Sequence, residues 1–322
     1  MKVSEIKRIG VLGGGGIIGS SWSTYFLWKG FPVSVYDVDE RALALSRERI
    51  TRNLSYLSEK KVLTKEAAKE ALGRALFTRD IKEAAYDVQF FQESVPENYA
   101  IKQSLLAALD QYGLPEALFA SSTSGLLITE IAKFSKYPER CIGAHPYNPP
   151  HLIPLVEINK GERTSEETIQ TAYDFYKKAG KEPIILKKEA LGFISNRLQL
   201  SLYREAIDLV MRGVCSVEDI DKAVCFGPGL RFALMGPNLI FQLGGGQGGL
   251  KGLLEHVGPS IEMWWADMAD WKTWPEGSRE KLQEGVMQEM VNRRPEEGRT
   301  TEEITHWRDD MLLKLLKLLN RI

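Results

Sequence analysis

Several features that mark large protein classes are scarce in this sequence. It has three cysteines, Cys141, Cys215 and Cys225, an odd number without a CxxC pair, so we expect no disulfide framework and a reducing compartment such as the cytoplasm. No stretch approaches the ~20 apolar residues that span a bilayer, and the first residues lack the apolar run of a signal peptide. Lysine plus arginine number 42 against 43 for aspartate plus glutamate, so no excess charge favours nucleic acid or an anionic membrane as partner.

What the sequence does contain is typical of a globular protein with a sizeable core. It has 322 residues, of which 43% are apolar and 26% are charged, enough for about two domains. Its first half alternates short apolar runs with helical patterns, which indicates a parallel sheet, because parallel neighbours need long crossover connections. We expect strands at residues 9–13, 33–37, 88–93, 118–122 and 183–186, and helices at residues 17–29, 98–112 and 166–178.

The remaining segments have helical patterns. A long charged stretch, residues 40–79, is broken near Val62 and predicts a helical hairpin inserted between strands. After Lys188 the strand signals mostly stop, and helical spacing continues at residues 191–212, 217–225 and 303–319. The expected fold class is therefore α/β, a Rossmann-type doubly wound sheet with a helical hairpin insertion, followed by a mainly α-helical domain.

The clearest motif is a glycine pattern at the first strand–helix junction. Gly14, Gly16 and Gly19 form G-x-G-x-x-G between the first expected strand and the first expected helix. Free backbone N–H groups at the start of that helix, including those of Ile17 and Ile18, combine with the helix dipole to favour the pyrophosphate of a dinucleotide. The alternative, a plain strand–helix turn, does not explain the acidic residue that follows.

Asp37 is that acidic residue, and it identifies the nucleotide. It ends the second expected strand, 23 residues after Gly14. A carboxylate at this place accepts a hydrogen bond from the ribose 2′-hydroxyl and repels a 2′-phosphate, so we expect NAD rather than NADP. The same glycine pattern recurs at Gly244, Gly246 and Gly249, but no strand precedes it, and a glycine-rich loop between helices explains it better.

These patterns predict two domains. We expect a NAD-binding Rossmann-like domain at residues 1–188 and a helical substrate and dimerisation domain at residues 189–322. The long amphipathic helix after Lys188 and the leucine stripe at residues 312–319 predict apolar surface that is buried against a second copy, most simply in a homodimer.

A second informative segment surrounds a proline-rich turn. His145 ends one apolar run and Glu157 lies in the next run, so the two side chains can meet. A carboxylate beside an imidazole fixes its tautomer and stabilises its protonated form. Alcohol oxidation needs such a base, because the hydroxyl proton must leave as hydride goes to the nicotinamide. A structural histidine before a proline is the alternative that these two residues leave open.

Together with further motifs, these residues resemble the 3-hydroxyacyl-CoA dehydrogenase family. Within it, the sequence is similar to the lambda-crystallin branch, which includes L-gulonate 3-dehydrogenase, and more distantly to carnitine dehydrogenase. The resemblance covers about residues 9–249. Its motifs are Gly-Gly-Gly-Ile-Ile-Gly-Ser-Ser-Trp at 14–22, Glu97-Asn with Lys102, Ser-Ser-Thr-Ser-Gly at 121–125, His-Pro-Tyr-Asn-Pro-Pro at 145–150, Pro-Leu-Val-Glu at 154–157 and Gly-Phe-Ile-Ser-Asn-Arg at 192–197.

The resemblance implies a NAD-dependent oxidation of a 3-hydroxyl group and a set of catalytic residues. His145 would be the general base and Glu157 its orienting partner. Ser124 and Asn196 would hydrogen-bond the reacting oxygen of the substrate and help to place the histidine.

Two further residues receive a role toward the cofactor from the same resemblance. Glu97 and Lys102 would contact the ribose on the nicotinamide side. Without the resemblance they are equally compatible with a solvated pair on a helix.

The sequence also departs from the acyl-CoA members of the family. These usually have an asparagine where Ser122 stands, and a shorter glycine–proline turn where residues 227–237 stand. Arg231 lies in that longer turn, and its guanidinium can hold a substrate carboxylate, which a thioester would not require. An ordinary surface or interface arginine is the alternative. We therefore expect a small free hydroxy acid, gulonate-like or another 3-hydroxycarboxylate, with 3-hydroxyacyl-CoA as the alternative substrate.

Other residues keep rival substrates and roles open. Lys60 and Lys61 lie near the end of the hairpin, where CoA enzymes of the family gather phosphate-binding residues. The tryptophans of residues 264–274 can build an aromatic cage for a quaternary ammonium such as that of carnitine, or can simply pack. A crystallin-like structural protein and a NAD-binding sensor are the non-enzymatic alternatives, although the expected catalytic residues are all present.

Overall fold

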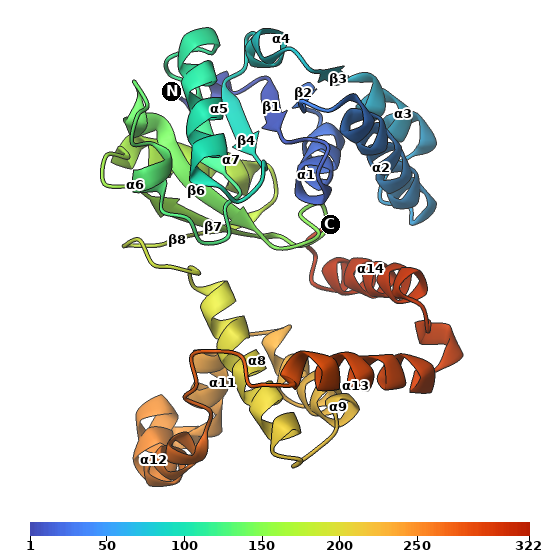
Figure 1. Cartoon of the computed structure of the whole chain (residues 1–322), viewed down its shortest axis with the longest axis vertical. Helices are drawn as coiled ribbons and strands as arrows, with labels where there is room; N and C mark the ends of the chain where they lie inside the picture. Colours follow the sequence, from blue (N-terminus) through green and yellow to red (C-terminus); the bar gives the residue numbers. More distant parts are fainter. The chain divides into compact units, whose positions relative to one another are not determined.

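The computed structural model describes residues 1–322, which form two compact units (Figure 1). Unit 1 comprises residues 1–196 and 309–322, and unit 2 comprises residues 197–308. The last fourteen residues of the chain thus belong with the N-terminal unit, whereas the sequence patterns assigned everything after Lys188 to one helical domain.

Unit 1 is built on one eight-stranded sheet, which confirms the expected Rossmann-type fold. The strand order is β3-β2-β1-β4-β5-β6-β7-β8. The pairs from β3 to β6 are parallel, β7 is antiparallel to β6, and β8 is parallel to β7. The order reverses between β1 and β4, which is where doubly wound sheets bind ligands. The strands are β1 (Ile9–Leu12), β2 (Val33–Tyr36), β3 (Ala75–Thr78), β4 (Phe90–Glu93), β5 (Leu118–Ser121), β6 (Cys141–Pro146), β7 (Leu155–Lys160) and β8 (Glu182–Ile185).

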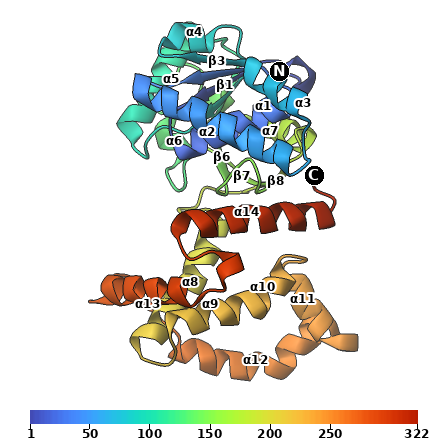
Figure 2. The same cartoon turned by 90° about the vertical axis from the view of Figure 1, so that its right-hand side faces the viewer.

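Helices cover this sheet and include the expected hairpin. Helices α2 and α3 lie side by side (Figure 2). The expected helical stretch of residues 40–79 is wrong at its end, because Ala75–Thr78 forms the edge strand β3. The helices are η1 (Val3–Glu5), α1 (Ile17–Trp28), α2 (Glu40–Glu59), α3 (Lys65–Gly73), α4 (Ile81–Ala85), α5 (Tyr99–Tyr112), α6 (Ile128–Ile131), η2 (Pro138–Arg140) and α7 (Glu166–Lys178).

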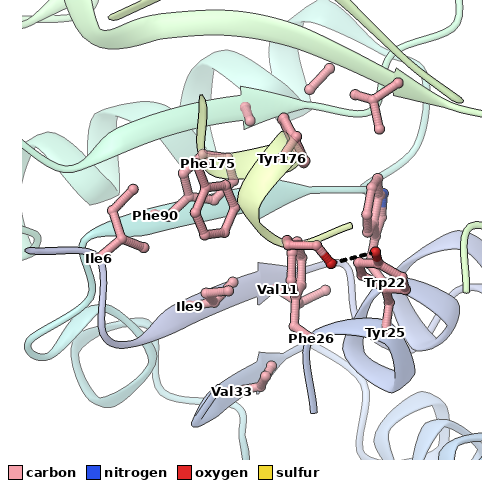
Figure 3. Close-up of a cluster of buried hydrophobic side chains, with 14 of the residues drawn as sticks. Ile6, Ile9, Val11, Trp22, Tyr25, Phe26, Val33, Phe90, Phe175 and Tyr176 are labelled. Atoms are coloured by element: carbon pink, nitrogen blue, oxygen red, sulfur yellow. Dashed lines mark hydrogen bonds between the residues drawn. The ribbon is translucent and has the colours of Figure 1, made fainter. Parts of the chain in front are cut away.

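An aromatic core fixes α1 and α7 on the sheet (Figure 3). The Trp22 ring stacks on Phe26 of the same helix with ring centroids 5.1 Å apart. Phe175 of α7 packs on Phe90 of β4 at 4.4 Å between ring centroids. Burying such rings is strongly favourable, so the helix that begins at the glycine loop is held firmly against the central strands.

Unit 2 is entirely helical, as expected. The second G-x-G-x-x-G motif, from Gly244 to Gly249, connects α11 to α12 through η3 and is therefore a loop between helices. No single helix of the chain is long and apolar enough to cross a membrane. One bent pair of helical segments, Val217–Phe232 with Pro237–Gly244, has the length and composition of a membrane span, but only when the two are taken together. The remaining helices are α8 (Ser195–Met211), α9 (Val217–Phe226), α10 (Pro228–Phe232), α11 (Pro237–Gly244), η3 (Gly246–Gly248), α12 (Gly249–Asp267), α13 (Ser278–Asn292), η4 (Pro295–Glu297) and α14 (Thr301–Leu318).

The leucine stripe near the C-terminus packs inside unit 1. Leu313 and Leu316 of α14 are buried with Leu57 of α2 and Leu152. The expectation that residues 312–319 present this face to a second copy is therefore wrong for these two leucines, because the apolar contact is made within the chain.

Candidate functional site

The glycine loop between β1 and α1 is shaped for close approach of a ligand. Gly13 has φ +74°, and a Cβ there would lie 2.7 Å from the backbone of Ser94. A Cβ on Gly19 would lie 2.2 Å from the carbonyl oxygen of Gly13, so only glycine lets α1 start this close to the loop. This is the tight strand–helix junction that Gly14, Gly16 and Gly19 predict.

The start of α1 suits an anion. Its N-cap is Gly16, and no side chain caps the helix. The amides of the first turn, Ile17 and Ile18 among them, therefore have no side-chain acceptor and face an approaching phosphate with the positive end of the helix dipole. These residues fit the pyrophosphate of a dinucleotide.

Asp37 follows β2 directly and borders the glycine loop. Its Oδ2 accepts a hydrogen bond from the Gly15 amide at 2.9 Å. From α2, Arg49 donates to the Gly15 carbonyl and Ser46 donates to the Gly14 carbonyl, each at 2.7 Å. The carboxylate is thus fixed at the strand end, where the ribose of NAD binds in this fold. Sequence reasoning did not identify Ser46 or Arg49, since neither belongs to a local motif.

His145 and Glu157 form a buried pair across two antiparallel strands. They lie directly opposite each other in the β6–β7 register, with 2.8 Å between His145 Nδ1 and Glu157 Oε2. The His145 side chain is 8% exposed and that of Glu157 is 0% exposed. With Nδ1 bound by the carboxylate, Nε2 is the nitrogen that can accept a proton. The structure therefore brings this predicted pair together.

The Glu157 carboxylate has three further donors from the chain that enters α8. Its Oε1 accepts hydrogen bonds from the amides of Ile194 at 3.0 Å and Ser195 at 2.9 Å, and its Oε2 accepts one from the Ser195 hydroxyl. Burial alone would raise the pKa of Glu157, but the hydrogen bonds from His145 and Ser195 outweigh it and lower that pKa. Glu157 is therefore a charged partner for the imidazole, and Ser195 is a contributor that sequence reasoning missed.

Ser124 and Asn196 lie next to each other. The Asn196 side-chain amide donates to the Ser124 carbonyl at 3.1 Å. The Ser124 amide in turn donates to Glu97 Oε1 at 2.8 Å. Three residues predicted from separate motifs thus form one connected group, in which Ser124 is exposed.

Lys102 is a buried support for Glu97. Its side chain is 0% exposed, and its Nζ lies 2.7 Å from Glu93 Oε1 and 3.4 Å from Glu97 Oε2. Burial raises the pKa of Glu93, and the Lys102 ammonium counteracts this. Thr123 also donates to Glu97, at 2.6 Å. The expected contact of Lys102 with the cofactor ribose stays a prediction, and Glu93 is a further residue that sequence reasoning missed.

Arg231 and the four tryptophans of residues 264–274, which the sequence suggested for substrate choice, all belong to unit 2 and differ in their contacts. Arg231 is exposed on α10 of unit 2. Trp271 donates to Asp208 at 3.3 Å, and Trp274 meets the Tyr203 ring at 6.5 Å. Trp264 and Trp265 are 62% and 67% exposed. Trp271 and Trp274 thus contact α8, although Trp274 is 52% exposed, whereas Trp264 and Trp265 lie exposed on α12.

Comparison with known proteins agrees with this geometry. The model of the 3-hydroxyacyl-CoA dehydrogenase NAD-binding domain matches residues 8–190, and that of the 3-hydroxyacyl-CoA dehydrogenase C-terminal domain matches residues 192–292. The L-carnitine dehydrogenase of Bacillus cereus is 37% identical over the whole chain and 95% of its own length. The L-carnitine dehydrogenase of Pseudomonas aeruginosa is 37% identical over 98% of this chain and 94% of its own.

Solved structures of dehydrogenases are also similar to this chain. The NAD+-dependent dismutase 5-formyl-3-hydroxy-2-methylpyridine 4-carboxylic acid 5-dehydrogenase is 29% identical, covers 97% of each chain and has a TM-score of 0.79. The 3-hydroxybutyryl-CoA dehydrogenase of Escherichia coli is 26% identical, with a TM-score of 0.69 over 87% of this chain and 57% of its own. The match thus extends through both units.

Proposed function

The chain belongs to the 3-hydroxyacyl-CoA dehydrogenase family and is a NAD-dependent dehydrogenase acting on a 3-hydroxy group, and we propose that its substrate is a small free 3-hydroxy acid of the carnitine type. Full-length relatives named L-carnitine dehydrogenase support this choice. The sequence motifs alone favoured a gulonate-like acid from the lambda-crystallin branch and placed carnitine dehydrogenase further away. None of the relatives described above supports gulonate, so carnitine takes its place.

The buried bond between His145 and Glu157 supports the oxidation itself, and the L-carnitine dehydrogenase relatives support the choice of substrate. Nδ1 of His145 donates to Glu157, so Nε2 accepts the proton of the substrate 3-hydroxyl while the carbon gives up hydride. Bound NAD supplies the hydride acceptor. The charge of Glu157 stabilises the imidazolium that forms. We assign Ser124 and Asn196 to the reacting oxygen and to the placement of the imidazole, because Asn196 is hydrogen-bonded to Ser124 and its neighbour Ser195 is hydrogen-bonded to Glu157.

Two features of unit 1 favour a free acid over a CoA thioester. Lys60, one of the two lysines near the end of the hairpin, is paired with Asp310 of α14 at 2.7 Å and is less available to a CoA phosphate, whereas Lys61 is exposed. Ser122, at the position of the usual asparagine of the CoA enzymes, accepts a hydrogen bond from Gln92 at 2.8 Å. We assign Arg231 to the carboxylate of the acid.

The cationic end of a carnitine-type substrate needs an aromatic or acidic neighbour. Trp271 and Trp274 are engaged with α8. Trp264 and Trp265, the most exposed of the four tryptophans, are therefore our candidates for this contact.

L-3-hydroxyacyl-CoA dehydrogenase is the second candidate function. It is favoured by the family itself, whose two domain models together match most of the chain. Non-enzymatic roles, as a crystallin-like structural protein or a NAD sensor, predict at most NAD binding without turnover.

A substrate screen separates these candidates. NAD reduction is measured with L-carnitine, gulonate, 3-hydroxybutyrate and 3-hydroxybutyryl-CoA, with a His145→Gln variant as the blank. We expect the highest kcat/KM with L-carnitine. Preference for the CoA thioester would replace the proposed substrate, and NAD binding without turnover of any of the four would contradict the enzymatic assignment.

A further inference from the structure

A buried lysine outside the catalytic pair holds the loop that joins the two catalytic strands. Residues 147–154 connect β6, which carries His145, to β7, which carries Glu157. Lys181, next to β8, is only 2% exposed. Its Nζ donates to the carbonyl of Ile153 at 3.0 Å and to the carbonyl of Pro150. One ammonium thus binds the loop at two points.

The surroundings of this ammonium are aromatic rather than acidic. Its Nζ lies 3.8 Å from the ring centroid of Tyr25 and 4.9 Å from that of Trp22, both on α1. The adjacent Glu182 carboxylate is bound instead by Lys177 and Arg321. A buried charge without an acid is costly, and two carbonyls and two rings offset only part of that cost.

The other titratable groups near Lys181 do not compensate its charge. Lys29, the C-cap of α1, His151 of the loop and Arg321 of the C-terminal segment line the same small cavity, and no Asp or Glu side chain lines it. Burial, followed by the charge of Lys29, lowers the pKa of Lys181 well below its usual range. An aliphatic side chain here would leave the buried carbonyls of Pro150 and Ile153 without this donor, so the lysine is explained by its hold on the loop.

The same loop is joined to α1 at a second point. The Ser21 hydroxyl lies 2.7 Å from His151 Nδ1 and accepts a hydrogen bond from the His151 amide at 3.0 Å. Helix α1 begins at the glycine loop, so Ser21, Trp22 and Tyr25 connect the cofactor-binding end of the helix to the loop. The loop that follows His145 is therefore held in a fixed position on helix α1.

We propose that Lys181 is a positioning residue of the oxidation: its side-chain amino group fixes residues 147–154 against α1 and so fixes His145 relative to the bound cofactor. The kinetic part of this proposal rests on the proposed function. Its structural part, the ordering of the loop, does not depend on which substrate the enzyme oxidises.

The test compares Lys181→Met with the matched control Lys177→Met, which alters an exposed lysine of α7. Three experiments are done well below the melting temperature: steady-state kinetics (kcat and KM) with the substrate found in the screen, NAD binding (the dissociation constant), and amide hydrogen exchange of residues 147–154. We expect Lys181→Met to lower kcat at least tenfold, because misplacement of a catalytic group by about 1 Å can cost about 10²-fold. NAD affinity should stay within about twofold, and exchange in the loop should rise. The control should change none of these.

The outcomes are distinguishable. Wild-type kcat with unchanged loop exchange in Lys181→Met would overturn the proposal. If that variant does not fold, Lys181→Gln, which retains donors, takes its place; failure of both to fold would assign Lys181 to stability and overturn the proposal as well. A wild type that oxidises none of the four substrates contradicts the proposed function, while loop exchange still tests the role of Lys181.

Discussion

The Ser195 hydroxyl donates a hydrogen bond to the same Glu157 carboxylate that binds His145. Together with two backbone amides, this gives the carboxylate four donors in a buried setting. The negative charge of Glu157 is therefore maintained by the fold, and the first residues of α8 are tied to the catalytic pair. Loss of this charge should affect both stability and turnover.

The stability effect depends on pH in a defined direction. The folded-state pKa of Glu157 is lowered, whereas a glutamate in the unfolded chain has a pKa of about 4.3. Its contribution to stability is therefore fully present above that value and is lost as pH falls through the folded value. We expect Glu157→Gln to lower the free energy of unfolding by about 1.5–3 kcal/mol at pH 7. The difference from wild type should shrink below about pH 4. Urea unfolding of both proteins at pH 7 and at about pH 3.5 measures this; a pH-independent difference would contradict it.

His145→Gln tests the base. If Nε2 takes the hydroxyl proton, kcat should fall by roughly 10²–10⁴. NAD affinity should stay near wild type, because the glycine loop and Asp37 are unchanged. The exposed His256 of α12 gives a matched control, and His256→Gln should keep normal kcat. Near-normal kcat in His145→Gln would show that another group takes the proton.

The sequence is informative where the decisive contacts are local. The β1–α1–β2 unit and the place of Asp37 follow from periodicity and glycine spacing over some thirty residues. His145 and Glu157 were paired because only a proline-rich turn separates their strands. The contact of Ser195 with Glu157, 38 residues apart, is set by the fold and has no local signal.

Two errors in the predicted structure have different physical origins. Strand β3 follows a helical pattern directly, and three of its four residues are only half-buried at the sheet edge. Its sequence therefore lacks the alternation of apolar and polar residues by which a strand is predicted. Leucine spacing in α14 correctly indicates a buried face. It does not say which surface covers that face, and Leu313 and Leu316 proved to pack on unit 1.

Asp37→Ala tests the cofactor assignment. Loss of the carboxylate removes the repulsion of a 2′-phosphate and an acceptor for the ribose, so the preference for NAD over NADP should narrow. Affinity for NAD should also fall, since Asp37 holds the Gly15 amide. Asp39→Ala, which removes the N-cap of α2, is the control and should keep the preference. Equal use of NAD and NADP by the wild type would refute the assignment.

Assembly is predicted to involve unit 2. Large apolar side chains stay exposed there, as in Phe226 at 74%, Leu230 at 61% and Leu243 at 69%. Such surface favours burial against another copy, most simply in a two-fold homodimer. Sedimentation at micromolar concentration should give a dimer, and Leu313→Ala should lower the melting temperature without dissociating it. A monomer under these conditions would contradict the prediction.

Arg231 tests the substrate class. If its guanidinium binds a carboxylate of the substrate, Arg231→Ala removes a charge-assisted hydrogen bond worth about 1.5–3 kcal/mol, or about 10- to 150-fold in KM. The loss should appear in KM for L-carnitine, with little change in kcat and little change for 3-hydroxybutyryl-CoA, which has no free carboxylate at that end. Arg231→Lys keeps the charge but not the two-pronged geometry, so its KM should lie between those of wild type and Arg231→Ala. Unchanged kinetics with the free acid would remove the reason for preferring it, and the acyl-CoA substrate would then be favoured.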